Sequence, residues 1–164
     1  MNAEDLGRAL ASYVRTILSG NSAYDRYLYG DRAALSAEER RGLEVFRGKA
    51  RCSTCHAGPN LTDEGFHNTG VAWRDGRLHD AGRFAVTGKE TDRGAFKTPT
   101  LREVARTAPN MHNGSLATLE DVIEFYNRGG NRNPSLDPEL RPLQLTAEEK
   151  LSLAAFLRSL SGSN

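Results

Sequence analysis

Apolar residues recur every three or four positions near both ends of the chain, which is the spacing of one face of an α-helix. The set near the N-terminus is Leu6, Leu10, Val14 and Ile17. The set near the C-terminus is Leu151, Ala154, Leu157 and Leu160. We therefore expect helices over residues 3–19, ended by Gly20, and over about residues 147–160.

Helix-start signals predict further helices between these two. The capping residues are Ser36 with Glu39, Thr118, and Thr146 with Glu149. A serine or threonine followed three residues later by glutamate is a capping box, which satisfies free backbone N–H groups at a helix start. We expect helices from Ser36 to about Phe46 and over residues 119–128, with a short helix or turn in the aromatic-rich segment 21–31.

The stretch from residue 57 to residue 117 shows no long helical or strand period. It is rich in glycine, asparagine, threonine and aspartate, and only residues 100–106 resemble a helix. A compact domain seldom carries so much irregular chain unless the segment is functional. The predicted fold is all-α without convincing strands. We expect one domain over 1–164, with an N-terminal helix and connecting segment (1–35) followed by a ligand-binding core (36–162).

Composition narrows the possible functions. Hydrophobic residues make up 38% and aromatic residues 7%, so we expect something other than side chains to complete the core. The 22 Lys and Arg nearly balance the 21 Asp and Glu, which argues against binding to nucleic acid or an anionic membrane. The start, MNAEDLGRAL, lacks the pattern of a secretory signal, so the chain is either cytosolic or a mature or excised domain.

The two cysteines form the motif Cys52-Ser-Thr-Cys55-His56. C-x-x-C-H is the attachment motif of c-type haem. Each thiol adds to one haem vinyl group, and the adjacent histidine is then held beneath the iron as an axial ligand. Covalent haem attachment normally takes place outside the cytoplasm, so we expect a periplasmic protein whose signal has been removed.

Other uses of the cysteines fit less well. A thioredoxin-like dithiol is expected in a βαβ unit, whereas a helix precedes this motif. A structural zinc site needs a second pair of ligands at short spacing, and the remaining histidines stand singly at His67, His79 and His112. A structural disulfide would leave the histidine and the thin core unexplained.

Three stretches resemble the second, C-terminal haem domain of the bacterial dihaem cytochrome c peroxidase and MauG-like family. They are NSAYDRYLYGDRAALSAEERRGLEVF, CSTCHAGPNLTDEGFHNTG and FKTPTLREVARTAPNMHNGSLATLEDVIEFYNRGG. The resemblance covers nearly the whole chain. It implies a cytochrome c-like fold in which the first and last helices cross and a long loop wraps one covalent haem.

The resemblance also implies what this chain lacks. Family members carry two haems, of which the N-terminal one reacts with peroxide and the C-terminal one relays electrons. This chain has one C-x-x-C-H motif, so its expected partner is a redox protein or a missing N-terminal haem domain. The family's calcium ion would bind the backbone carbonyls of Thr107 and Pro109, although a further ligand would come from the missing domain. The histidine of the family's TAPxxHxG pattern corresponds to His112, expected near the haem in a hydrogen-bonding rather than a ligating role.

Two charged side chains are expected to bind the haem propionates. Lys97 and Arg102 lie in FKTPTLR, and an arginine fork matches the geometry of a carboxylate. The alternative is that both are solvated surface charges.

Two residues compete for the sixth position on the iron. The family resemblance places the distal ligand at Tyr126, where peroxidases carry methionine and MauG-like proteins carry tyrosine. Tyr126 also shares a predicted helix face with Leu119, Val122 and Ile123. The rival is Met111, on a loop beyond Pro109, and water or an empty position is the third possibility.

These features predict an electron-transfer haem c domain, closed at both axial positions. The alternative is a haem enzyme with an open distal face that reacts with peroxide, which needs an acid or base above the iron. Because the domain that resembles the catalytic half is absent, we expect the isolated chain not to be catalytic.

Overall fold

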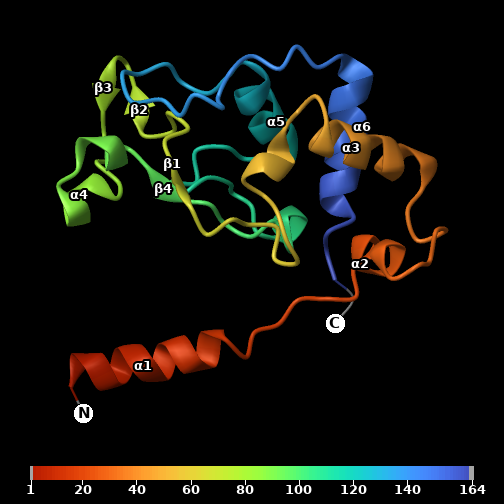
Figure 1. Cartoon of the computed structure of the whole chain (residues 1–164), viewed down its shortest axis with the longest axis horizontal. Coiled ribbons are helices and arrows are strands. Elements are labelled where there is room, and N and C mark those ends of the chain that lie inside the picture. The colour runs from red at the N-terminus through yellow and green to blue at the C-terminus, as the bar shows by residue number, and fades with distance from the viewer. Residues whose placement is uncertain (1, 163–164) are drawn as a thin grey trace.

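The structure, a computed structural model, describes residues 2–162, and helices dominate it (Figure 1). The longer helices are α1 (Ala3–Val14), α2 (Ala23–Leu28), α3 (Ala37–Arg47), α5 (Leu119–Asn127) and α6 (Ala147–Arg158). The short helical turns are η1 (Cys52–Thr54), α4 (Phe84–Thr87), η2 (Glu90–Asp92) and η3 (Val104–Arg106). The strands are β1 (Phe66–His67), β2 (Trp73–Arg74), β3 (Arg77–Leu78) and β4 (Phe96–Lys97).

The core forms where α3 crosses α6, with α5 packed on the other side of α6. Phe156 of α6 is fully buried, and its ring contacts those of Tyr24 and Phe46 at centroid distances of 5.3 and 5.1 Å. The two helices approach so closely at Gly42 that an added Cβ would lie 1.9 Å from the carbonyl oxygen of Ser152. A glycine is therefore required at this crossing.

The predicted helix starts are confirmed. Capping boxes open α3 at Ser36, α5 at Thr118 and α6 at Thr146. The apolar face predicted for the last helix is only partly right, because Leu151 is 61% exposed. The side chains of α6 that face the core are Ser152, Leu153, Ala154, Phe156 and Leu157, followed by Leu160.

The N-terminal helix is shorter than expected. We predicted residues 3–19, but α1 ends at Val14. None of its residues is buried, and Figure 1 shows it lying apart from the rest of the chain. Short helices gain most of their stability from packing against the rest of the protein. Since α1 makes no such contacts, nothing stabilises a further helical turn beyond Val14.

The irregular middle of the chain contains two small antiparallel sheets, which corrects the prediction that strands are lacking. Strand β1 pairs with β4, and β2 pairs with β3. The second pair is a hairpin whose turn is Asp75–Gly76, both with positive φ. An Asp-Gly pair is a strong signal for such a turn, and the sequence analysis did not use it. The helix expected over 100–106 is only the 3₁₀ turn η3.

The core also includes side chains that precede α3. Tyr24 and Leu35 belong to the same buried cluster as Phe156, so the packed part of the chain begins well before residue 36. None of the helices within residues 2–162 is long and apolar enough to cross a membrane.

Candidate haem-binding site

The cysteine motif follows directly on α3. That helix ends at Arg47 with Gly48 as its C-cap, and Arg51 then takes a left-handed conformation with φ of 54° before the 3₁₀ turn η1 begins at Cys52. Backbone N–H groups of Cys55 and His56 both donate to the carbonyl of Cys52. This turn keeps the two thiols and the histidine close together at the edge of the core, against which Cys52 packs.

His56 is oriented by the loop that follows it. Its Nδ1 lies 3.0 Å from the carbonyl oxygen of Leu61, a buried residue. When Nδ1 carries the proton and donates it to this carbonyl, Nε2 is left as the nitrogen that binds a metal. Burial lowers the pKa of His56, which favours the neutral ring that metal binding requires.

The two cysteines are free thiols with raised pKa values. Burial raises the pKa of Cys52 to about 12, and burial together with nearby carboxylates raises that of Cys55 to about 11. Redox dithiols instead have lowered pKa values, because the thiolate is the nucleophile. The environment of these thiols therefore does not support a thioredoxin-like function.

Tyr126 lies on α5 near both thiols. Burial, followed by the proximity of Cys52 and Cys55, raises its pKa, and its hydroxyl group bonds to Thr69. The α5 face expected to point inward is only partly right: Leu119 and Ile123 are buried, Val122 and Tyr126 are half-buried, and Phe125, which was not expected there, is buried. The structure thus brings Tyr126 to the same region as the motif.

Met111 and His112 lie on another loop. Met111 is half-buried in the turn closed by the Asn110–Leu116 pair. The ring of His112 stacks on Phe96, with centroids 3.7 Å apart, and its Nε2 lies 3.4 Å from a carboxylate oxygen of Asp80.

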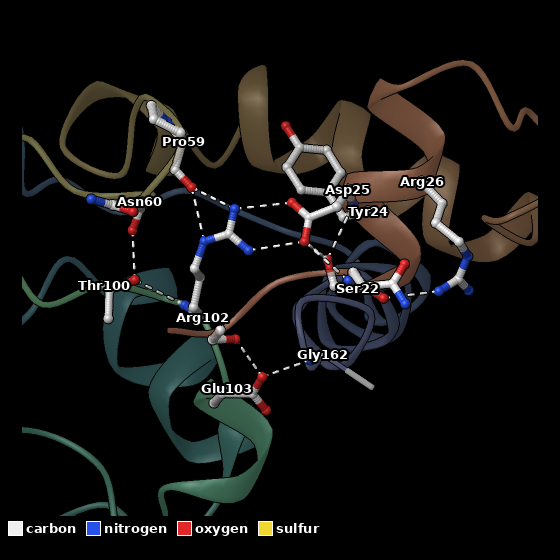
Figure 2. A network of polar contacts seen from close by, with 12 residues as sticks. Ser22, Tyr24, Asp25, Arg26, Pro59, Asn60, Thr100, Arg102, Glu103 and Gly162 are labelled. Atoms are coloured by element: carbon white, nitrogen blue, oxygen red, sulfur yellow. Dashed lines mark hydrogen bonds and ion pairs between the residues drawn. The ribbon is translucent and has the colours of Figure 1, made fainter. Parts of the chain in front are cut away.

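Arg102 is bonded to protein groups rather than left free for a propionate. Its guanidinium forms two hydrogen bonds with Asp25, of 3.0 and 2.9 Å, and two with the carbonyl of Pro59 (Figure 2). These bonds tie the segment after the cysteine motif to α2. The pairing with Arg102, aided by Ser22, lowers the pKa of Asp25 to about 2.

The other predicted ligand-binding groups are at the surface. Lys97 pairs with Glu64 at 2.6 Å, and its side chain is 47% exposed. Thr107 and Pro109, the candidate calcium ligands, are both exposed. Within residues 2–162 neither of their carbonyl groups accepts a backbone hydrogen bond.

Sequence reasoning missed a cluster around His67. Its Nδ1 lies 2.7 Å from Asp137 and its Nε2 lies 2.9 Å from Asp63, and the group also reaches Cys55. Burial alone would lower the pKa of His67, but the two carboxylates outweigh it and raise that pKa. A protonated ring has no lone pair for a metal. Asp137 lies seventy residues beyond His67, and no spacing rule connects the two.

The donor set fits covalent haem c. Two thiols on one tight turn can reach one edge of the macrocycle, and the next residue is an oriented imidazole. The indole Nε1 of Trp73 is also buried without a hydrogen-bond partner among residues 2–162, and it is a donor that a carboxylate of a bound cofactor can satisfy. Cys52, Cys55 and His56 would hold the group.

The relatives of this chain are named as MauG and cytochrome-c peroxidase proteins, which is consistent with a haem site. The chain is 39% identical over 98% of its length to the methylamine utilization protein MauG of Methylorubrum extorquens. It is 41% identical over 93% of its length to the cytochrome-c peroxidase IdrP1 of Denitromonas iodatirespirans. The chain belongs to the MauG and dihaem cytochrome c peroxidase family. It spans about half of these relatives, 45% and 48%, which fits a C-terminal domain of that family.

Solved structures agree with the family assignment. A MauG-like protein associated with microbial copper homeostasis superposes with a TM-score of 0.77 at 37% identity, covering 87% of this chain and 52% of that one. The dihaem peroxidase BthA of Burkholderia thailandensis gives a TM-score of 0.68 at 27% identity, covering 87% and 46%. No protein-family model matches the chain. The predicted resemblance to MauG-like proteins and cytochrome c peroxidases is thus confirmed.

Proposed function

We propose that the chain is an electron-relay domain with one covalent haem c, held by Cys52 and Cys55. His56 and Tyr126 would be the residues that bind its iron. The observation that carries this proposal is that Tyr126 lies near enough to both thiols for them to raise its pKa, although α5 and the motif are about seventy residues apart in the sequence. The names of the relatives, cytochrome-c peroxidases and MauG, support haem redox chemistry.

The bound haem supplies one-electron chemistry, at a potential that depends on the axial ligands and on solvent access. The protein's part is to fix those ligands. The Leu61 carbonyl sets the direction of the His56 ring, and the position of Tyr126 on α5 sets that of the phenol. A phenolate ligand stabilises ferric iron and lowers the potential, whereas the thioether of Met111 would raise it.

The relay passes electrons to or from a second haem domain or a partner protein in the periplasm. The alternative, a site open on its distal face that reacts with peroxide, predicts that Tyr126 is not a ligand. The coordination state of the ferric iron therefore separates the two proposals.

The test is the absorption spectrum of the haem-loaded chain with Tyr126→Phe. We expect the ferric haem to become high-spin or to recruit Met111, with a sulfur–iron band in the far red that Met111→Ala then removes. Tyr24→Phe, which removes another buried phenol, is the control and should leave the spectrum unchanged. An identical ferric spectrum in Tyr126→Phe would refute tyrosine ligation. Acid–acetone extraction of the unaltered chain should leave the haem on the polypeptide, and haem in the solvent phase would refute covalent attachment.

A further inference from the structure

Cys55, Asp63 and His67 form a cluster beside the cysteine motif. A ring nitrogen of His67, a carboxylate oxygen of Asp63 and the Sγ atom of Cys55 all lie within 4.8 Å of one another. The side chains of Asp63 and His67 are 29% and 26% exposed, and that of Asp137, at the other nitrogen of the ring, is 18% exposed. The loop after the motif, strand β1 and the linker between α5 and α6 each contribute a residue. Electron relay by a bound haem leaves Asp63 and His67 without a role.

The thiol of Cys55 has polar neighbours that the thiol of Cys52 lacks. Burial and then nearby carboxylates, Asp63 first, raise the pKa of Cys55. Cys52 packs against the core, and its Sγ atom lies 3.6 Å from the carbonyl oxygen of Ala50. Burial, a backbone hydrogen bond and Cys55 act on the pKa of Cys52, and no carboxylate or imidazole within residues 2–162 is among these influences. The two thiols of one motif therefore stand in different chemical surroundings.

Addition of the Cys55 thiol to a vinyl group requires a base. The thiolate is the nucleophile, and the raised pKa of Cys55 keeps its proton on the sulfur. The neutral ring of His67, which is present above the pKa of that residue, can accept this proton. Asp63 and Asp137, at 2.9 and 2.7 Å from the two ring nitrogens, would stabilise the imidazolium that forms. One water molecule can bridge a separation of up to 4.8 Å between the sulfur and the ring.

We propose that His67, supported by Asp63 and Asp137, is the general base and acid for the attachment of haem to Cys55. The proposal rests on the covalent haem c of the proposed function. The ring takes the thiol proton as the sulfur bonds to the inner carbon of a vinyl group, and it then gives this proton to the outer carbon. One S–H bond and one carbon–carbon π bond are lost, and one C–S bond and one C–H bond form. The step is redox-neutral, so it consumes no oxidant or reductant.

The first experiment measures attachment at each thiol separately. Cys52→Ala leaves Cys55 alone, and Cys55→Ala leaves Cys52 alone. Each full-length chain is mixed with ferrous haem without oxygen, above the pKa of His67, and the haem that resists acid–acetone extraction is followed over time. We expect His67→Gln to slow attachment at least about tenfold in the Cys52→Ala chain and to change it less than about twofold in the Cys55→Ala chain. The exposed His79→Gln is the control and should leave both rates unchanged.

A merely structural role of His67 gives a different result in the same experiment. A chain whose fold is disturbed by His67→Gln would lose attachment at both thiols to the same extent. Equal slowing of the two single-thiol chains would therefore overturn the proposal, and so would an unchanged rate at Cys55.

The second experiment uses Asp63→Asn to separate proton transfer from simple electrostatics. Asp63 raises the pKa of Cys55, so its removal alone would release more thiolate and speed the attachment. The proposal predicts the opposite result. Attachment to Cys55 should slow at least roughly threefold, because the imidazolium loses one of its two carboxylates. Faster attachment in the Asp63→Asn chain would overturn the proposal.

The outcomes for His67 and for the covalent haem are distinguishable. Haem that attaches to neither thiol of the unaltered chain would refute covalent haem c, and this proposal with it. Haem that attaches to both thiols, at rates that respond equally to His67→Gln, would refute the role of His67 alone.

Discussion

At the scale of single residues, the structure assigns Arg102 a role different from the one its sequence context suggested. The fork geometry that matches a propionate also matches Asp25, and the structure shows the arginine bonded to that carboxylate. The buried pair joins α2 to the segment that follows the haem motif (Figure 2). It therefore stabilises the loop that positions the motif.

Replacing Asp25 with asparagine should lower the free energy of unfolding by about 2 kcal/mol at pH 7. The pKa of Asp25 is about 2 in the folded chain, below its ordinary value of 3.8. The stabilisation is thus complete above about pH 4 and is lost as the pH falls through 2. Urea unfolding at pH 7 and pH 3 measures this, with the exposed Asp75→Asn as a control that should have no effect. An equal loss at both pH values would contradict the ion-pair interpretation.

The contribution of His67 to the free energy of unfolding should depend on pH in the opposite sense to that of Asp25. Its pKa is raised, so its contribution is complete below pH 6.5 and is lost as the pH rises through the folded value. His67→Gln should cost roughly 1–2 kcal/mol at pH 6 and less at pH 9. Urea titrations at both pH values check this, with the exposed His79→Gln as control. A larger loss at pH 9 than at pH 6 would show that the ring is not charged.

At the scale of elements, the crossing of α3 and α6 depends on one glycine. Gly42→Ala should destabilise the chain by about 3 kcal/mol, because the new Cβ would overlap the Ser152 carbonyl and lie 2.7 Å from the Cβ of Phe156. Gly7→Ala is the matched control in a helix, since nothing lies within 4 Å of its Cβ position. Thermal unfolding of both variants tests this, and equal stabilities would mean that the crossing is not tight.

The sequence predicted those elements whose signals lie within a few neighbouring residues. The starts of α3, α5 and α6 were predictable because each capping box lies within four residues. The exposure of α1 was not predictable, because periodicity shows that a face is apolar and not what covers it. Likewise, the C-x-x-C-H spacing was enough to identify a haem-attachment motif. The contacts of Arg102 with Asp25 and of His67 with Asp137 were not predictable, because they join distant segments that share no sequence pattern.

At the scale of the whole molecule, the chain corresponds to one half of its relatives and contains a single haem motif. We expect the haem-loaded chain to reduce peroxide at least roughly 100-fold more slowly than a full-length relative, because the ligation by Tyr126 that we propose would leave no open position on the iron for peroxide. Stopped-flow assays with a common electron donor measure this. Tyr126→Phe combined with Met111→Ala would remove both candidate distal ligands, and this double variant should be faster than the unaltered chain. Saturable turnover by the unaltered chain at the rate of a full-length relative would refute the relay assignment.

The pairing of α3 with α6 also leads to an expectation about folding: the last helix should dock late. Lys49, just after α3, and Glu149, in the first turn of α6, are 100 residues apart in sequence, yet their side chains pair at 2.7 Å. Contacts that close so long a loop form slowly and require the last helix to be present. Until then the segment after α3 is not held against a core. We therefore expect Cys52 and Cys55, the proposed sites of haem attachment, to be more accessible before α6 docks than afterwards.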